Sequence, residues 1–443
     1  MRKRGKWAGM LSVVAVACSS TPSEREITYE RDVRPLVEEN CTTCHRQGGI
    51  GPFSFDEWSS VEEHRGLMVG AVTSGIMPPW PADETCHPLS EVRRLSASAK
   101  ETFRRWQQGG YLRGDPAEYR APEKAGWVDP GEPSRLIRMA EPYVPPTSVT
   151  DEYRCFLIAD TFDADTFVTV MDIRPGNKRV VHHVQMHVIP ASSIAQVEQL
   201  DAAAPEPGYP CAIGIPGSYN MFSWRPGTLP VGFEPGDAGL VDAGSRIELQ
   251  VHYNMEHLAP GEAPEGDVTE LALWTLPAGA LPDRIVRRKG AMVLPLSIPA
   301  GEPHVVVEQQ WTGGVLSAVG PTLAAVPAQI IGETPHMHAL GTRLSATRTD
   351  EAGNSMCLAD VPRWDFTWQF DYAYASDAAV ALGQNDLITV RCEYDNSAEN
   401  QQLDASGALR APRDVGFGEG TSDEMCLNYV WLRYDRQAFL EAR

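Results

Sequence analysis

The run Leu249-Gln250-Val251-His252-Tyr253 indicates the secondary structure of most of this chain, because apolar and polar residues alternate along it. A period of two places the apolar side chains on one face of a β-strand. Similar short segments, separated by Gly, Pro, Asp and Asn, occur at 166–170, 179–188, 246–253 and 387–392. This pattern predicts antiparallel β-sandwiches. Because about 300 residues exceed one simple sandwich, we expect two in tandem, at residues 134–283 and 284–443.

The first part of the chain has a different pattern and predicts a small all-α domain over residues 27–113. Apolar residues recur at helical spacing after Asp32 and again over 61–73. A third helix is predicted with Ser98 and Glu101 as a capping box and Gly109-Gly110 as its end. Residues 114–133 are rich in Pro, Gly and charge and are predicted to be a linker.

The motif Cys41-Thr42-Thr43-Cys44-His45 lies directly after the first predicted helix. Two thiols at this spacing can bond covalently to the haem vinyl groups, and the adjacent His45 is placed as the proximal iron ligand. A zinc knuckle or a redox Cys-x-x-Cys pair would not need the histidine. Helix, haem motif, helix, methionine loop and helix is an order that resembles class I cytochrome c, with one covalent haem c.

Met77 is the preferred candidate for the distal iron ligand. It lies in the Pro-rich stretch Gly75-Ile76-Met77-Pro78-Pro79, where a rigid backbone can hold a thioether over the iron. Met68 falls inside a predicted helix and is more simply a core residue. His64 and His87 are rivals, and each is more simply a surface or loop histidine.

His336-Met337-His338, followed much later by Met425, supplies two imidazoles and a thioether. On a strand, residues i and i+2 point to the same face, so His336 and His338 can bind one metal ion. Thioether sulfur holds Cu(I) and imidazole holds both copper oxidation states. The set therefore favours copper, provided that the fold brings Met425 to the histidines; otherwise Met425 is ordinary packing.

A second, all-nitrogen site is predicted from His182, His183 and His252. Neighbours on a regular strand point to opposite faces, so His182 and His183 can bind one ion only if the strand is bulged or twisted there. The alternative is three unrelated histidines, one of them in the core. His187, His257 and His304 are possible substitutes in the ligand set.

The net charge and the cysteines indicate which partners and which cellular location the protein can have. The 443-residue chain carries a formal charge of −21, which argues against a nucleic-acid partner. Residues 1–18 have a basic start and a short apolar run, as in an export signal, and Ala15-Val16-Ala17-Cys18-Ser19 is similar to a lipobox with Cys18 as a possible lipid anchor. The remaining six cysteines are even in number and favour disulfides in an oxidising compartment; they are Cys86, Cys155, Cys211, Cys357, Cys392 and Cys426. We therefore expect an exported protein, periplasmic or associated with the outer membrane as a bacterial lipoprotein.

Four segments in order resemble the copper type II, ascorbate-dependent monooxygenases, the family of peptidylglycine α-hydroxylating and dopamine β-monooxygenases: 181–183, 250–253, 336–338 and 422–426. The resemblance implies two tandem jelly-roll-like all-β domains with one copper each. It implies an electron-transfer copper at the three histidines and an oxygen-activating copper at His336, His338 and Met425. It also implies a disulfide between Cys392 and Cys426.

Two further residues match positions near the family's active site, and two others depart from it. Tyr429 matches an active-site tyrosine, and Gln250 matches a glutamine beside the electron-transfer copper. Peptidylglycine hydroxylases hold a substrate carboxylate with an arginine where this chain has Thr334, and their asparagine is replaced by Leu427, with Asn428 one place later. These departures argue against peptidylglycine as the substrate.

These features together predict a copper-dependent monooxygenase that hydroxylates a C–H bond of a small molecule or peptide with O2. Such a reaction needs two external electrons, which ascorbate supplies in the animal enzymes. Here a fused haem, reduced by an external one-electron donor, could deliver them singly, first to the His182/His183/His252 copper and then onward, with the linker raising the effective concentration of the donor. The alternative is a non-catalytic copper-binding or electron-transfer protein built on the same scaffold.

Overall fold

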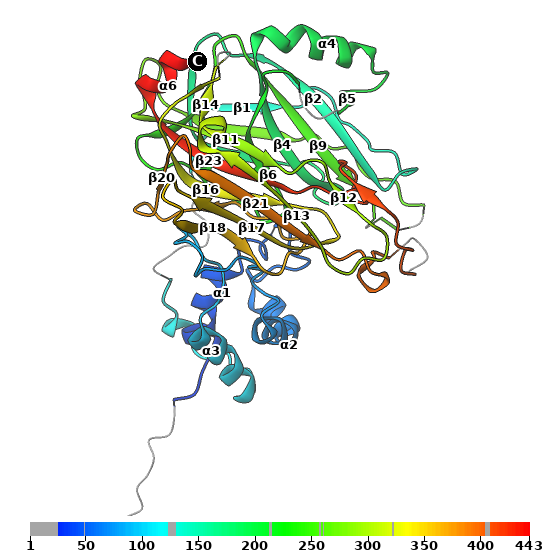
Figure 1. Ribbon diagram of the computed structural model, residues 1–443. Coiled ribbons are helices and arrows are strands. Elements are labelled where there is room, and N and C mark those ends of the chain that lie inside the picture. The colour runs from blue at the N-terminus through cyan, green and yellow to red at the C-terminus, as the bar shows by residue number, and fades with distance from the viewer. Residues whose placement is uncertain are drawn as a thin grey trace, which may run out of the picture.

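The computed structural model describes residues 25–47, 49–122, 130–211, 215–256, 258–259, 261–320, 323–403 and 408–443. The predicted export signal with Cys18, part of the predicted linker and His257 lie outside these residues. Figure 1 shows two regions, a small helical part made by the start of the chain and a larger part built of strands. The chain is mostly β-sheet with few helices.

The helical part packs three helices around the buried aromatic residues Phe103 and Trp106. Helix α1 ends at Asn40 and leads directly into Cys41, as the sequence predicted. The predicted cap of the third helix is wrong. The N-cap is Ser96, whose side chain accepts a hydrogen bond from Ala99 N at 3.1 Å. The elements are η1 (Tyr29–Val33), α1 (Arg34–Asn40), α2 (Trp58–Ser74), α3 (Ala97–Gln108) and η2 (Pro116–Glu118).

A ten-stranded sheet runs through the whole β part. Its first strands belong to the first half of the chain, and the parallel pairing of β8 with β11 joins them to strands of the second half. The two predicted halves therefore share one continuous sheet. Its strands are β1 (Arg135–Arg138), β3 (Thr166–Arg174), β7 (Val231–Gly232), β8 (Asp237–Val241), β10 (Glu270–Thr275), β11 (Arg284–Met292), β16 (Ala328–His336), β19 (Tyr372–Ala373), β20 (Val380–Leu382) and β23 (Leu427–Asp435).

Two smaller sheets contribute to two separate cores. Residues from β2, β4, β6 and β9 pack with β1, β3 and β10 in the first half, while residues from β17, β18 and β21 pack with β11, β16 and β23 in the second. This layering agrees with β-sandwich domains. The five-stranded sheet consists of β2 (Asp151–Thr161), β4 (Val181–Ile189), β5 (Tyr209–Pro210), β6 (Tyr219–Trp224) and β9 (Arg246–Asn254). The four-stranded sheet consists of β13 (Val305–Thr312), β17 (Gly341–Thr349), β18 (Ser355–Val361) and β21 (Leu387–Tyr394).

Short elements complete the β part, and helix α4 follows β4. These elements are η3 (Ala191–Ser193), α4 (Ile194–Ala203), β12 (Ser297–Ile298), α5 (Gly313–Leu316), β14 (Ala318–Val319), β15 (Ala324–Ala325), η4 (Ala398–Asn400), β22 (Val415–Gly416) and α6 (Arg436–Ala442). Among the described residues, no helix combines the length and the apolar character needed to span a bilayer.

Three disulfides join the six cysteines that the sequence left unpaired. Cys392–Cys426, which the family resemblance implied, is present, and Cys155–Cys211 lies within the first half of the β part. Cys86–Cys357 joins the helical part to β18 across 271 residues. A covalent bond therefore adds to the predicted linker in holding the helical part to the β part.

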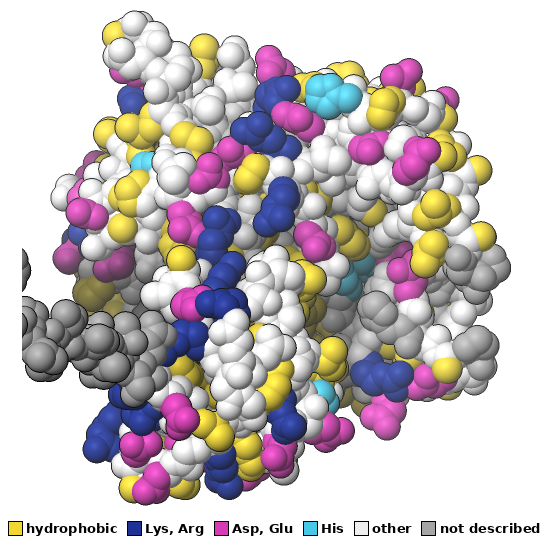
Figure 2. All heavy atoms as spheres, turned by 90° about the horizontal axis from the view of Figure 1, so that it is seen from below, with side chains coloured by type: hydrophobic (Ala, Val, Ile, Leu, Met, Phe, Trp, Pro, Cys, Tyr) yellow, Lys and Arg dark blue, Asp and Glu magenta, His cyan; other side chains and the backbone are white. Residues whose placement is uncertain are grey.

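Figure 2 views the molecule from the side of the helical part. Lys and Arg side chains form a band across this face, with acidic side chains scattered on both sides of it. This face therefore carries a basic band, although the chain as a whole has a formal charge of −21.

Candidate metal centres

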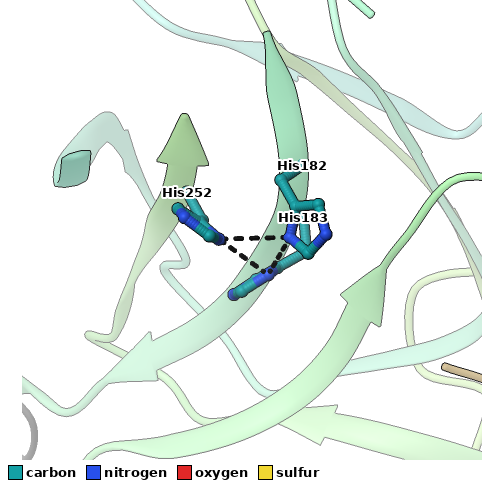
Figure 3. Close-up of side chains that lie close together, drawn as sticks. All are labelled: His182, His183 and His252. Atoms are coloured by element: carbon teal, nitrogen blue, oxygen red, sulfur yellow. Dashed lines mark hydrogen bonds between the residues drawn. The ribbon is translucent and has the colours of Figure 1, made fainter. Parts of the chain in front are cut away.

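Three histidine side chains converge between β4 and β9 (Figure 3). The Nδ1 atom of His182 lies 3.2 Å from that of His183 and 3.2 Å from that of His252, and the last two are 3.3 Å apart. Three nitrogens that each lie about 2.0–2.1 Å from one ion in tetrahedral directions are about 3.3 Å apart. The spacing thus fits a single metal ion held by three Nδ1 atoms.

The local backbone explains how two adjacent histidines reach one point. The pairing of β4 with β9 shifts register between Val181 and His183, and His183 then lies opposite His252. Such a bulge turns one side chain away from the regular alternation. The irregularity that the sequence required at His182-His183 is present.

The surroundings of this cluster keep the imidazoles neutral and oriented. Burial lowers the pKa of His252, and burial together with the neighbouring histidines lowers the pKa of His183 well below its usual range. His252 Nε2 lies 2.8 Å from a carboxylate oxygen of Asp151, to which it donates, so Nδ1 carries the free lone pair. The Tyr153 ring stacks on His252 with centroids 4.1 Å apart. A carboxylate behind a histidine is a common support for a metal ligand.

His336 and His338 form a second pair, with ring centroids 5.2 Å apart. The prediction that both lie on a strand is wrong in part, because β16 ends at His336 and His338 lies two residues beyond it, outside any strand. His336 Nδ1 donates to Gln369 Oε1 at 2.7 Å, and His338 Nδ1 donates to the Asp423 carbonyl at 3.0 Å. Both Nε2 atoms therefore keep a lone pair for a metal.

The pairing of β16 with β23 brings Met425 near His336 and His338. His336 lies opposite Leu427 in the antiparallel pair of β16 and β23, two residues after Met425. The buried Glu424 carboxylate accepts hydrogen bonds from His338 N at 2.8 Å and Leu340 N at 2.7 Å. Burial raises the pKa of Glu424 to about 8. The bond between Cys426 and Cys392 anchors the next residue, so the segment that carries Met425 is fixed from both sides.

One cavity of about 310 Å³ is lined by members of both ligand sets. His183 from the first set and His336 and Met425 from the second line it. The rings of His183 and His336 are 6.4 Å apart. The cavity is of the size that small-molecule sites have, and both sets can act on one bound molecule.

Both predicted active-site residues outside the ligand sets line this cavity. Tyr429 projects from β23, and its hydroxyl donates to Gln185 Oε1 at 3.4 Å. Gln250 is buried on β9 opposite Gln185 of β4. Arg225 also lines the cavity and was not singled out from the sequence, because its role depends on a tertiary contact, an ion pair with Asp371 at 3.1 Å.

The residues that differ from those of peptidylglycine hydroxylases, Thr334 and Leu427, lie in different surroundings. Thr334 is fully buried, where it donates to Asp371 and accepts from Trp431 Nε1, both at 2.8 Å. Leu427 lines the cavity, whereas Asn428 donates to the buried Glu333. Neither Thr334 nor Asn428 lines the cavity.

Two of the alternative histidines have other partners. His187 lines the cavity but approaches Glu248 at 3.6 Å, and His304 is exposed beside Glu393 at 3.3 Å. Neither joins the group of three.

A larger, mainly apolar cavity of about 720 Å³ surrounds the Cys-x-x-Cys-His motif. Cys41, Cys44 and His45 line it, and the two cysteines are the free ones among the described residues. His45 Nδ1 donates to the Phe53 carbonyl at 3.0 Å, which leaves Nε2 available. A Cβ atom at Gly51 would lie 2.6 Å from His45 Nδ1, so the imidazole needs glycine there. Two thiols, an oriented imidazole and apolar walls fit a covalently attached haem.

The candidates for the distal ligand differ in their surroundings. Met77 and Met68 both line this cavity, so the geometry favours neither of them over the other. His64 stacks on Phe53 with centroids 3.9 Å apart, and His87 lies outside the cavity with Nε2 2.8 Å from the Ala378 carbonyl. Neither His64 nor His87 lines the cavity.

Residues 318–439 match the family model of the copper type II ascorbate-dependent monooxygenase, C-terminal domain. The match includes His336, His338, Met425 and Tyr429 and supports the family that the motifs suggested. No curated protein matches the chain. The copper chemistry of the family agrees with the imidazole and thioether donors.

Solved structures also match the chain, at low sequence identity. A protein from Parabacteroides distasonis is 9% identical, with 68% of this chain and 88% of that chain covered and a TM-score of 0.16. A protein of infectious bursal disease virus, Gx strain, is 12% identical, with 70% and 81% covered and a TM-score of 0.09. Neither likeness bears on the function.

Proposed function

We propose that the protein is an exported copper-dependent monooxygenase that hydroxylates a C–H bond with O2 and receives electrons through a c-type haem on the same chain. The observation that carries the proposal is that two copper-type ligand sets, His182/His183/His252 and His336/His338/Met425, lie beside one cavity, which His183, His336 and Met425 line. The reaction inserts one oxygen atom into the substrate and reduces the other to water with two electrons and two protons.

Copper bound at these sets would supply one-electron transfer and O2 activation. The protein's part is to hold the donors and shape the cavity. Asp151 fixes the orientation of His252, and Glu424 ties the turn after His336 to Met425. These contacts keep the ligands in place when the copper charge changes.

Substrate binding is assigned to the cavity between the two sets. Tyr429, Gln185 and Gln250 provide polar groups on one side, and Leu427 and Met292 provide apolar contacts. We propose Tyr429 and Gln250 as residues that contact the substrate. The cavity size favours a small molecule or the end of a peptide.

Haem attachment is proposed at Cys41 and Cys44, with His45 as one axial ligand and Met77 as the other, in a domain of residues 27–113. The mainly apolar cavity supports this assignment. The three disulfides and the lack of a membrane-spanning helix among the described residues fit an exported protein. A lipid anchor at Cys18 and a periplasmic or outer-membrane place belong to the same proposal, as do tandem copper domains at 134–283 and 284–443.

The test uses the full chain loaded with haem and copper. X-ray absorption of the Cu(I) form should show a copper–sulfur contribution that Met425→Ala removes. Pre-reduced haem mixed with O2 should be reoxidised faster with copper than after chelation, and Met425→Ala should abolish this difference. Met356→Ala is the matched control, because Met356 is an exposed methionine on β18. If reoxidation is as fast without copper, the protein is an electron carrier and the proposal is wrong.

A further inference from the structure

Residues 366–370 lie between the haem-type cavity and the copper-type ligands. Trp368 and Phe370 line the cavity that contains Cys41 and Cys44. Gln369, between them in sequence, lines the other cavity and accepts the hydrogen bond from His336 Nδ1 at 2.7 Å. One short segment thus touches both candidate redox sites.

The helical part is held against this segment by a rigid connection. The Cys86–Cys357 disulfide is flanked by backbone hydrogen bonds from Ser90 N to Ala373 O at 2.9 Å and from Ala375 N to Pro88 O at 3.0 Å. These contacts extend the sheet edge at β19 and fix residues 86–90 to the β part. The predicted linker is therefore not needed to hold the helical part beside residues 366–370.

Aromatic and basic side chains add to the contact between the helical part and the β part. Trp80 packs against Phe370 with centroids 5.8 Å apart. Arg93 donates to the Gly227 carbonyl at 3.3 Å and lies over the Phe370 ring at 5.0 Å. A Cβ atom at Gly227 would lie 3.4 Å from Cys44 Sγ, so the β part reaches the motif itself.

We infer that electrons pass from the haem to the His336/His338/Met425 site directly, through Trp368 and Phe370 and then through Gln369 to His336. This inference rests on the proposed function. In each step one electron leaves ferrous haem, which becomes ferric, and reduces Cu(II) to Cu(I); no bond forms or breaks.

The route through Gln369 is favoured over delivery to the three-histidine site. From Trp368 onward this route consists of covalent bonds and one short hydrogen bond, which couple redox centres better than a gap across space. The competing route uses Phe366, whose ring stacks on His182 with centroids 4.9 Å apart. That route ends in a van der Waals contact, so we assign it the slower transfer.

The experiment follows electron transfer without turnover. The full chain, loaded with ferric haem and Cu(II), receives one electron per haem from a photoreduced flavin without O2, and loss of ferrous haem absorption is recorded together with the Cu(II) resonance. We expect Trp368→Leu and Gln369→Leu to slow haem oxidation by about tenfold or more, equal to about 1.4 kcal/mol of barrier. Gln369→Glu keeps an acceptor for His336 and should retain most of the rate. Trp311→Leu, on the distant strand β13, is the control and should leave the rate unchanged.

Variants that empty one copper site identify the acceptor. His338→Ala should remove the fast phase of haem oxidation, whereas His252→Ala should retain it. The opposite result, or an unchanged rate in both Trp368→Leu and Gln369→Leu with normal haem and copper content, contradicts the inference alone. A chain that takes up neither haem nor copper contradicts the proposed function and the inference with it.

Discussion

Removal of the Cys86–Cys357 disulfide tests how the helical part is held. The two cysteines are 271 residues apart, and in the chain-entropy model a loop of this length contributes about 5 to 6 kcal/mol to stability. The change is Cys86→Ser with Cys357→Ser. The control is Cys155→Ser with Cys211→Ser, a bond across 56 residues that contributes about 4 kcal/mol in the same model.

The assay is denaturant unfolding of the three proteins under oxidising conditions, followed separately by haem absorption and by circular dichroism of the strands. We expect the Cys86/Cys357 variant to lose more stability than the control, and its haem signal to change before its strands unfold. Transfer of an electron from haem to copper should also slow in this variant but not in the control. A loss below about 1 kcal/mol with an unchanged transfer rate would refute the reasoning.

Three further predictions concern stability and metal affinity. Burial raises the pKa of Glu333 from 4.5 to about 8, so the stability of its neutral form is present below pH 4.5 and is lost as pH rises through about 8. Glu333→Gln should therefore unfold like the wild type at pH 5 but be more stable at pH 9, by up to about 5 kcal/mol in denaturant titrations. Asp151→Ala removes the acceptor behind His252 and should weaken copper binding at the three-histidine site by about 10- to 100-fold in titrations. Ser96→Ala removes the cap on Ala99 N and should destabilise the helical part by about 1 kcal/mol, whereas equal stability would mean that the cap is not formed.

Local patterns in the sequence led to the elements that carry the candidate sites. The residues of the Cys-x-x-Cys-His motif are close in sequence, so the position of His45 beside both thiols follows from the motif itself. The bulge at His182-His183 also followed from sequence, because strand geometry forbids two neighbours from sharing a face otherwise. The N-cap of α3 could not be predicted from the sequence. Ser96 and Ser98 can both cap a helix, and only the path of the backbone selects Ser96.

What the sequence determined by itself is the set of donor types: imidazoles, a thioether and a haem motif, together with the alternation that favours strands. The tertiary structure decided which of them meet. Met425 approaches His336 because β16 and β23 pair in one register, and six cysteines allow many pairings until the chain folds. The contact of Trp368 and Gln369 with two cavities joins segments hundreds of residues apart, and such contacts depend on packing between surfaces that no local pattern encodes.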